Sequence, residues 1–382
     1  MMSSVKRDPK QFGQLLKMAV RKIALQTGKK IAIVQDELGY ALGRDSGGVA
    51  IQFWERGNIP ARKEEVELLK EELVRRQGLG GEEAAQFAVY AGFPELEQKP
   101  NQPFVAGPPI TDPRLFFGRT YELRRLFALW DDPAMPLQNG ALIGPRGSGK
   151  TSLLFYLMTI TRTPPAKLRP DQRTNWVGQM ETIRWVYVDF RNPQFGTRSG
   201  LLRYLLTTFE LPVPAPCDLE RFVEAMSKHL HDPAIILLDE IDVALERYGE
   251  LDDPFWDGLR ALASTQLNGR LGFVLAAREL PQQAARRHHR SSDFFSIFAY
   301  TAPLGPFTEP EARALIATSP IRFADDDIDW ILAQSRCWPL LLQILCRECL
   351  LAQQERTPAA EWQEAALHQL VPFQHLLATV QP

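Results

Sequence analysis

The first 92 residues place apolar side chains at helical spacing, with glycine-containing turns between the apolar stretches. Phe12, Leu15, Leu16, Ala19 and Ile23 follow the three- and four-residue spacing of one helix face. This pattern predicts helices at residues 11–25, 33–42, 49–54, 62–77 and 80–92. Several short helices joined by tight turns are typical of a helix-turn-helix module.

Residues 114–305 follow another pattern, in which short apolar runs alternate with amphipathic stretches. A turn into an amphipathic helix is expected around residues 116–126. Buried strands are predicted at 141–143, 183–190, 234–238 and 271–277, and helical segments at 152–158, 200–210 and 218–231. Strands that alternate with helices predict an α/β fold with a mainly parallel sheet.

Residues 306–382 return to helical spacing. Thr308 followed by Glu311 is a helix-capping pattern, and Pro310 suits the first turn of the helix that follows. Helices are expected up to residue 318 and at 326–335, 339–354 and 359–370. This segment is predicted to form a helical lid on the α/β core.

A proline-rich stretch separates the first two patterns, since six prolines fall between Pro94 and Pro113. Such a composition is typical of an extended linker. The predicted organisation is a helix-turn-helix domain with an extra helix at 1–93, a linker at 94–113, an α/β core at 114–305, and a helical lid at 306–382.

The charge is unevenly distributed, although the whole chain of 382 residues carries a formal net charge of only −2. Residues 1–80 contain 15 Lys and Arg against 10 Asp and Glu, which leaves the remainder near −7. A basic module on an acidic remainder indicates contact with nucleic acid. The absence of a signal-like or membrane-spanning apolar run leads us to expect a cytoplasmic protein.

Four cysteines are too few for a disulfide framework. Cys346 and Cys349 form a C-x-x-C pair within an apolar helical stretch. No second Cys or His pair stands at zinc-finger spacing. A structural role in the core is therefore the favoured interpretation, and metal or redox chemistry is the alternative.

The motif that carries the most chemistry is Gly144-Pro145-Arg146-Gly147-Ser148-Gly149-Lys150-Thr151, which fits G-x-x-x-x-G-K-[ST] at every fixed position. An apolar run precedes it and a helical stretch follows it, as a phosphate loop requires. Its backbone N–H groups would surround phosphates at a helix N-terminus. Lys150 would reach the β- and γ-phosphates, and Thr151 would place its hydroxyl on Mg²⁺. The alternative is a glycine-rich turn that binds nothing.

The apolar run at 234–238 ends in Asp239 and Glu240, where a buried parallel strand would present two carboxylates. Asp239 would hold the hydration shell of Mg²⁺, and Glu240 would polarise the attacking water. Another strand ends at Arg278, a cation expected at the same sheet edge and able to meet a γ-phosphate. A surface arginine at a strand end is the alternative for Arg278.

The predicted catalytic residues are thus Lys150, Glu240 and Arg278, with Thr151 and Asp239 as the Mg²⁺ site. The residues expected to bind nucleotide are Gly144, Pro145, Arg146, Gly147, Ser148, Gly149, Lys150, Thr151, Ser152 and Pro339. A basic cluster at 286–290 is expected to supply an arginine to a neighbouring subunit, to bind DNA, or only to be solvated.

The segment 35–43 followed by Trp54-Glu55-Arg56-Gly57-Asn58-Ile59-Pro60 resembles the Cro/C1-type (xenobiotic-response-element) helix-turn-helix. The resemblance covers about residues 10–75. It implies that Gln35 meets a DNA phosphate and that the segment from Gly47 to Gln52, including Gly48, faces the major groove. The turn is about two residues longer than usual, and two glycines replace polar base-reading residues. A protein-docking or autoinhibitory surface is the alternative.

The phosphate loop, the acidic strand and the strand ending in Arg278 resemble the AAA+/STAND group of P-loop NTPases over about residues 115–350. Phe117-Gly118-Arg119 is similar to the opening motif of the replication-initiator-like and STAND branches. The segment 335–343 is similar to the STAND lid motif, in which a proline, here Pro339, packs near adenine. Arg336 and Cys337 stand where that motif usually has glycines.

The resemblance implies ATP and Mg²⁺ as ligands and a slow, regulatory ATPase that acts as a switch, with DNA as the expected partner. Two alternatives stay open. One is a DNA-loading or transposition-regulator ATPase that assembles into oligomers on DNA. The other is a transcription regulator that binds ATP with little hydrolysis, and a homo-oligomer or protein partner fits any of the three.

Overall fold

The computed structural model describes residues 7–44, 47–76, 78–93, 102–132, 134–164, 168–169, 172 and 182–378. Residues 94–101 of the predicted linker therefore lie outside the described residues. The chain divides into two compact units, one formed by 1–104, 313–331 and 344–368, the other by 105–312, 332–343 and 369–382. Among the described residues, no helix is both long and apolar enough to cross a membrane.

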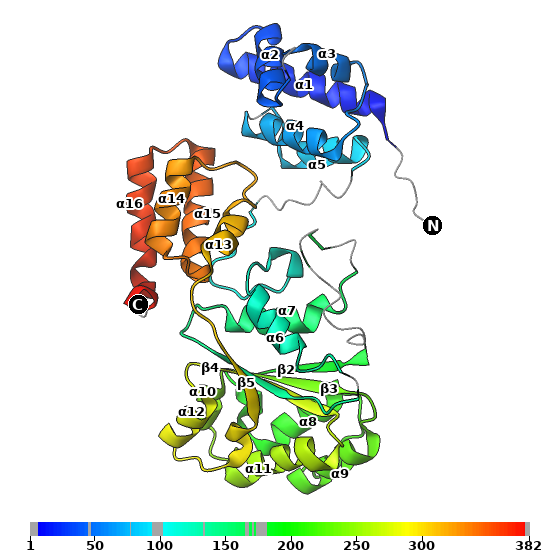
Figure 1. Ribbon diagram of the computed structural model, residues 1–382, viewed down its shortest axis with the longest axis vertical. Helices are drawn as coiled ribbons and strands as arrows, with labels where there is room; N and C mark the ends of the chain where they lie inside the picture. Colours follow the sequence, from blue (N-terminus) through cyan, green and yellow to red (C-terminus); the bar gives the residue numbers. More distant parts are fainter. Residues whose placement is uncertain are drawn as a thin grey trace. The chain divides into compact units, whose positions relative to one another are not determined.

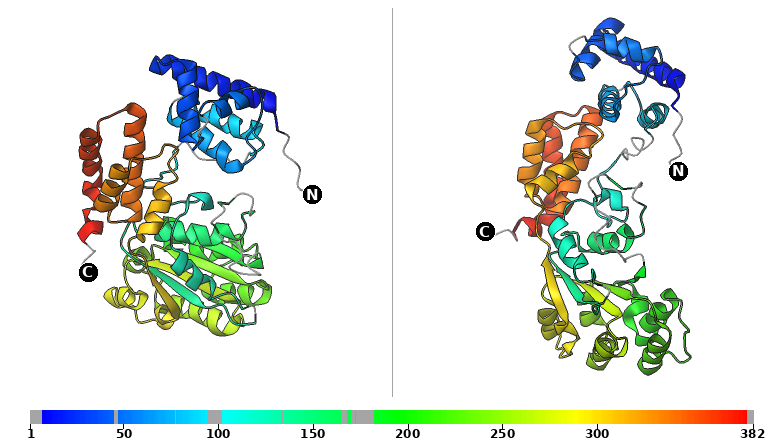
Figure 2. Two further views of the ribbon diagram at one scale, coloured as in Figure 1. Left: turned by 45° about the horizontal axis from the view of Figure 1, so that its top comes forward. Right: turned by 45° about the vertical axis from the view of Figure 1, so that its right-hand side comes forward.

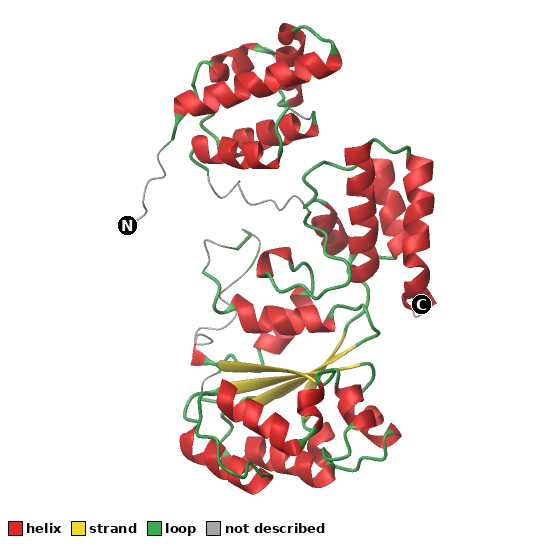
Figure 3. Cartoon of the chain, turned by 180° about the vertical axis from the view of Figure 1, so that it is seen from behind, coloured by secondary structure: helices red, strands yellow, loops and turns green. Residues whose placement is uncertain are grey.

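The second unit is built on one parallel five-stranded sheet in the order β2-β3-β4-β1-β5. Figure 3 shows this sheet in yellow with helices on both sides of it. Its strands are β1 (Asn139–Ile143), β2 (Arg184–Asp189), β3 (Ala234–Asp239), β4 (Leu271–Ala277) and β5 (Phe298–Pro303). Every residue of β3 and β4 is buried, as expected for central strands covered on both faces. The predicted α/β fold with a parallel sheet is confirmed.

Helices cover both faces of this sheet (Figure 1). One face packs on α6 (Thr120–Phe127) and α7 (Lys150–Ile160) through an apolar cluster that includes Leu154 and Leu237. The other face packs on a larger, aromatic-rich cluster around Trp256. Its helices are α8 (Arg198–Thr208), α9 (Leu219–His229), α10 (Ile241–Arg247), α11 (Asp253–Ala261) and α12 (Pro281–Arg287). The apolar clusters on the two faces of the sheet fix the positions of β1, which leads into the phosphate loop, and of β3, the acidic strand.

The sequence pattern missed β5 and the helices α10 to α12. β5 is an edge strand that pairs with β1 alone, and its six residues are mostly half-buried or exposed. An edge strand of this kind lacks the continuous apolar run that marks a central strand. The three helices are only seven to nine residues long, which leaves too few turns for a clear periodicity.

The N-terminal helices are α1 (Pro9–Thr27), α2 (Ile31–Ala41), α3 (Val49–Glu55), α4 (Lys63–Arg75) and α5 (Gly81–Tyr90) (Figure 2). They bury their own apolar cluster, which includes Phe12, Leu38 and Trp54. The expected helices are present, with bounds shifted by a few residues. Gly39 lets α2 approach the turn before α3 closely, because a Cβ atom there would lie 1.9 Å from the carbonyl oxygen of Gly47.

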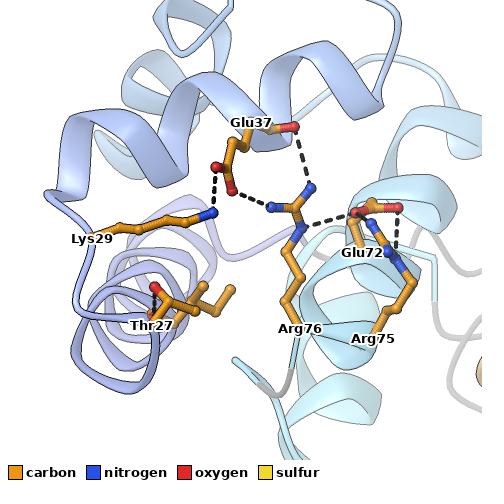
Figure 4. Close-up of polar contacts among 7 residues, drawn as sticks. Thr27, Lys29, Glu37, Glu72, Arg75 and Arg76 are labelled. Atoms are coloured by element: carbon orange, nitrogen blue, oxygen red, sulfur yellow. Dashed lines mark hydrogen bonds and ion pairs between the residues drawn. The ribbon is translucent and has the colours of Figure 1, made fainter. Parts of the chain in front are cut away.

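Ion pairs join α2 and α4 at one end of this bundle (Figure 4). Glu37 accepts hydrogen bonds from Lys29 at 2.6 Å and from Arg76 Nη1 at 2.8 Å. Glu72 also contacts Arg76, at 3.0 Å. The hydrogen bond from Lys29 is the main reason that the pKa of the Glu37 carboxyl lies below its usual value, against a weaker opposing effect of burial. Part of the basic surplus of this module is therefore used in holding its helices together.

The C-terminal helices are α13 (Glu309–Ile316), α14 (Asp325–Ser335), α15 (Pro339–Glu355), α16 (Ala359–Leu370) and α17 (Gln374–Ala378). All but α17 were expected. Cys346 and Cys349 are fully buried on α15, and burial raises the pKa of the Cys349 thiol to about 12. Full burial of both side chains within the helical cluster is the environment that a structural role in the core requires.

Candidate functional site

The phosphate loop joins β1 to α7, as the motif requires. Gly147 and Gly149 have φ angles of 91° and 92°, values that residues with side chains rarely adopt. Lys150 Nζ donates to the carbonyl oxygens of Gly144 at 2.7 Å and Pro145 at 3.1 Å. Burial lowers the pKa of the Lys150 amine, and the carboxylates at the end of β3 oppose that shift. The ammonium thus faces both the loop and the acidic strand end.

Asp239 lies next to the first turn of α7, as predicted for a metal site. Its side chain is 1% exposed, and its Oδ2 accepts hydrogen bonds from Thr151 Oγ1 at 2.7 Å and from Tyr187 OH at 2.8 Å. Its Oδ1 accepts the backbone N–H of Glu240 at 2.9 Å. Three donors therefore surround one buried carboxylate. Burial, and then the nearby Asp239, raise the pKa of the Tyr187 phenol, which keeps it a hydrogen-bond donor.

Glu240 directly follows Asp239 and is the N-cap residue of α10, with a φ angle of 54°. Its carboxylate lies 3.6 Å from Arg191 Nη1. Arg191 also binds Asp189, at the end of the neighbouring strand, through Nη2 at 2.8 Å. Burial raises the pKa of the Asp189 carboxyl, but the hydrogen bonds from Arg191 outweigh burial and hold that pKa below its usual value. The half-buried Glu240 therefore lies beside a cation that follows β2.

Arg278 directly follows β4, at the same sheet edge. Its backbone N–H donates to Asp242 Oδ2 at 3.2 Å, while its side chain is exposed. In the basic cluster at 286–290, Arg287 binds Glu279 at 2.5 Å and Arg290 reaches the carbonyl of Tyr248 at 3.4 Å. Two arginines of the cluster are thus used within the fold.

Arg119 connects the phosphate loop to the segment after β5. Its guanidinium is buried, and Nη2 donates to the carbonyl oxygens of Ser148 at 3.0 Å and Gly305 at 2.5 Å. It also lies over the ring of Phe307, whose N–H donates to the carbonyl of Cys337 at 2.8 Å. Burial lowers the pKa of Arg119. A continuous set of contacts therefore runs from the loop to the residues just before α15.

The start of α15 also approaches the phosphate loop. A Cβ atom on Gly147 would lie 2.9 Å from Leu340, the residue after Pro339, and 3.1 Å from Leu376 on α17. The neighbouring His375 ring nitrogen lies 3.1 Å from the carbonyl oxygen of Arg146. Side chains that follow the predicted lid proline therefore lie against the glycine-rich loop.

Before α15 the backbone is left-handed at two successive residues that are not glycine. The φ angles are 45° at Arg336 and 58° at Cys337, the two positions where glycine is usual in the resembling motif. A residue with a side chain in this region costs roughly 1–3 kcal/mol. The geometry that suits glycine is thus kept here without glycine.

The donor set at Thr151 and Asp239 suits Mg²⁺. This ion prefers oxygen ligands and usually takes one or two carboxylates, waters and substrate phosphates rather than a protein cage. The described residues contain no group of three or more His, Cys, Asp or Glu that could form such a cage. A hydroxyl and a carboxylate 2.7 Å apart beside the phosphate loop fit the ion and its water shell.

The three residues expected to contact DNA are placed differently from one another. Gln35 is 6% exposed, donates to Glu55 Oε2 at 2.9 Å and accepts from Gln52 at 3.2 Å. Gly48 is buried, and its N–H donates to Asp36 Oδ1 at 2.8 Å. Of the three, Gln52 alone is exposed, and it neighbours the exposed Phe53 on α3.

Sequence reasoning missed Tyr187, Arg191 and His375. Tyr187 and Arg191 lie in and just after a strand that was recognised only by its apolar pattern. In parallel pairing Asp189 lies opposite Asp239, a register that would have pointed to this strand as part of the site. His375 belongs to a five-residue helix that has no periodic signal.

Comparison with known proteins matches residues 137–279 to the family model described as AAA domain. A search of curated protein sequences found no match. Similar solved structures include a Walker-type ATPase of Pyrococcus abyssi (15% identity, 71% of this chain and 78% of that chain, TM-score 0.47). Another is the ORC2 protein of Aeropyrum pernix with ADPNP and ADP (15% identity, 70% of this chain and 73% of that chain, TM-score 0.47).

Domain III of the replication initiation protein DnaA from Thermotoga maritima is a third similar structure (16% identity, 72% of this chain and 97% of that chain, TM-score 0.42). The family model and the geometry of Lys150, Thr151 and Asp239 agree with each other. Over residues 137–279 the chain is therefore similar to an AAA domain, and the matched segment contains both the phosphate loop and the acidic strand.

Proposed function

We propose that the protein is an ATP-binding and ATP-hydrolysing regulatory switch of the STAND/AAA+ type. The observation that carries this proposal is the meeting of the phosphate loop, Asp239 and Glu240 at one edge of the sheet, with lid residues against the same loop. The loop would hold the phosphates and the acids would serve hydrolysis. The lid contacts would sense which nucleotide is bound.

Each polar residue has a separate part in this proposal. Lys150 would exchange its two carbonyl partners for phosphate oxygens, and Thr151 with Asp239 would hold Mg²⁺, which neutralises charge on the phosphates. Glu240 would orient and polarise the attacking water. Arg278, with its exposed side chain at the sheet edge, would approach the γ-phosphate.

The lid part rests on contacts within one unit. Leu340 and Leu376 pack at Gly147, and Arg119 joins Ser148 to the segment that leads to the lid. A change of loop conformation on nucleotide binding would alter both sets of contacts. Pro339 would lie near the adenine, and slow turnover would suit a protein whose output is a conformational state.

The N-terminal module would be the output domain of a cytoplasmic protein, and duplex DNA is its proposed partner. Support comes from the basic surplus of residues 1–80 and from an α3 face that exposes Gln52 and Phe53. Because Gln35 is buried in bonds to Glu55 and Gln52, a phosphate contact by Gln35 would need those bonds to open.

A second candidate is a DNA-loading or transposition-regulator ATPase that forms oligomers on DNA. The exposed Arg286, at the end of α12, favours it, since the neighbouring Arg287 and Arg290 are held within the fold. Arg286 would then reach the nucleotide of an adjacent subunit. A transcription regulator that binds ATP but scarcely hydrolyses it is the non-enzymatic alternative.

ATP hydrolysis by the full chain, with and without duplex DNA and alongside light scattering, separates these functions. Slow hydrolysis by a monomer that does not respond to DNA is the result expected of the switch. Stimulation by DNA together with growth to a ring or filament would favour the loading ATPase. ATP binding without measurable turnover would favour the regulator.

A further inference from the structure

Among the described residues, Tyr187 is the one hydrogen-bond donor to Asp239 that belongs neither to the phosphate loop region nor to the acidic strand and the residue after it. Its hydroxyl donates to Asp239 Oδ2 at 2.8 Å, the same oxygen that accepts from Thr151 at 2.7 Å. The phosphate-loop motif accounts for Thr151 but provides no tyrosine. The role of this hydroxyl therefore needs a separate explanation.

Strand register explains how the phenol reaches the carboxylate. Tyr187 pairs with Leu237 in β3, two residues before Asp239, and alternation places all three side chains on the α7 face of the sheet. Two residues along a strand span about 6.6 Å, which a tyrosine side chain can bridge and a shorter side chain cannot. The ring packs on Phe155 of α7, with centroids 4.7 Å apart.

The tyrosine backbone is also held in place. Tyr204 OH, from α8, donates to the carbonyl oxygen of Tyr187 at 2.9 Å, and β2 is paired with β3 along its whole length. The Tyr187 ring is thus held by packing against Phe155, and the Tyr187 backbone is held by the hydrogen bonds between β2 and β3. Its hydroxyl has little freedom to leave Asp239.

We propose that Tyr187 is a positioning residue that sets the orientation of the Asp239 carboxylate for the water shell of Mg²⁺. With Tyr187 and Thr151 both on Oδ2 and the Glu240 N–H on Oδ1, the carboxylate plane is fixed from two sides. Donors behind a metal-binding carboxylate typically change metal affinity by about 10–100-fold when they are removed. This inference rests on the proposed nucleotide-binding function.

The variant Tyr187→Phe tests it, because the ring stays packed on Phe155 and only the hydroxyl is lost. The readout is the binding of a fluorescent ATP analogue to the full chain, measured in EDTA and across a Mg²⁺ titration. We expect unchanged affinity in EDTA and a rise of about 10–100-fold in the Mg²⁺ concentration that half-saturates the metal-dependent part of binding.

Tyr204→Phe is the matched control, since it also removes a tyrosine hydroxyl, one that bonds the backbone of Tyr187, but leaves all the hydrogen bonds to Asp239 in place. It should leave the Mg²⁺ dependence unchanged. Tyr187→Leu adds loss of the ring, so it should show the same Mg²⁺ shift as Tyr187→Phe together with a lower melting temperature.

Three outcomes would overturn the assignment: no Mg²⁺ shift in Tyr187→Phe, an equal shift in Tyr204→Phe, or an equal loss of affinity with and without Mg²⁺. Each would mean that Tyr187 only packs the sheet. If the wild-type chain bound no ATP analogue in either buffer, that result would instead contradict the proposed function. The two failures are therefore distinguishable.

Discussion

The phosphate loop and the helix-turn-helix segment both carry sequence motifs, yet the structure uses the two motifs differently. In the loop, the predicted residues Thr151 and Asp239 meet at 2.7 Å, although 88 residues separate them in the chain. In the N-terminal module, Gln35 and Gly48 are buried and bonded within the fold. The residues of the first motif meet at one sheet edge, whereas the two buried residues of the second contribute to helix packing.

The difference has a physical origin. Phosphate is bound mainly by backbone N–H groups, so the motif that permits the loop conformation also creates the site. DNA sequence is read by exposed side chains on a helix, and many side chains are compatible with one helix-turn-helix fold. Residues shared with a fold family can therefore be structural, as Gly48 is where α2 and α3 meet.

The largest expected effect is on ATP turnover when Glu240 is substituted. If turnover did not change, the sheet edge beside the phosphate loop would not be a hydrolytic site. Glu240→Gln should lower ATP turnover by about 100- to 1,000-fold, because a neutral amide cannot polarise the attacking water. ATP binding should persist. Steady-state phosphate release measures the turnover, and a fluorescent ATP analogue measures the binding.

The matched control is Glu246→Gln, an exposed position on α10. It should leave turnover at the wild-type level. Equal turnover in wild type and Glu240→Gln would move the protein towards the regulator that binds ATP without hydrolysing it.

The next effect tests whether the N-terminal motif is structural. Gly39→Ala should destabilise the chain by about 3 kcal/mol, since its Cβ would lie 1.9 Å from the carbonyl oxygen of Gly47 and force the helices apart. Urea unfolding followed by circular dichroism measures the loss. Gly249→Ala, where no atom lies within 4 Å of the new Cβ, should stay within about 0.5 kcal/mol of wild type.

If Gly39→Ala were as stable as Gly249→Ala, the close approach of α2 to the turn before α3 would not hold in solution. ATP binding by Gly39→Ala should be retained, because the phosphate loop is built from other elements. Lower stability with retained ATP binding would show that the N-terminal motif serves helix packing independently of the phosphate loop.

A smaller change in the free energy of unfolding, of opposite sign, is expected for a substitution at the start of the lid. Cys337→Gly should stabilise the protein by about 1 kcal/mol, because its φ angle of 58° is one that glycine adopts readily. Ala333→Gly, in the exposed part of α14, should destabilise by about 1 kcal/mol. Destabilisation by both substitutions in thermal melts would argue against the left-handed backbone at Cys337.

The smallest effect concerns pH. The pKa of Asp189 is held below its usual value by Arg191, so the pair stabilises the folded state above the unfolded pKa and loses that effect as pH falls through the folded pKa. Arg191→Ala should cost about 0.5 kcal/mol at pH 7, since the arginine is half-exposed. Urea unfolding should show this difference vanish in acid, and a constant difference would contradict the pairing.

Much of the architecture was predictable from the sequence. Apolar periodicity located β1 to β4 and most of the longer helices, because buried central strands and amphipathic helices need those patterns. β5 escaped because edge strands do not need them. The positions of Lys150, Thr151, Asp239 and Glu240 followed from a motif whose geometry is set by backbone conformation.

Other parts of the site required the structure itself. Tyr187 acts across strands, through a register that no single strand reveals. Arg119 joins Ser148 to Gly305, which is 157 residues further along the chain than Ser148, through a contact that depends on the complete fold. The burial of Gln35 depends on Glu55 and Gln52, whose side chains meet it only after the helices pack.

The most direct test of the central claim is equilibrium binding of ATP with Mg²⁺ to the wild-type chain and to Lys150→Ala. Lys150 is expected to carry a charged contact to the phosphates, so its loss should weaken binding by about 100-fold, or roughly 2.7 kcal/mol. Wild-type binding that falls in this way would support the phosphate-loop assignment. Equal affinity in the two proteins would contradict it.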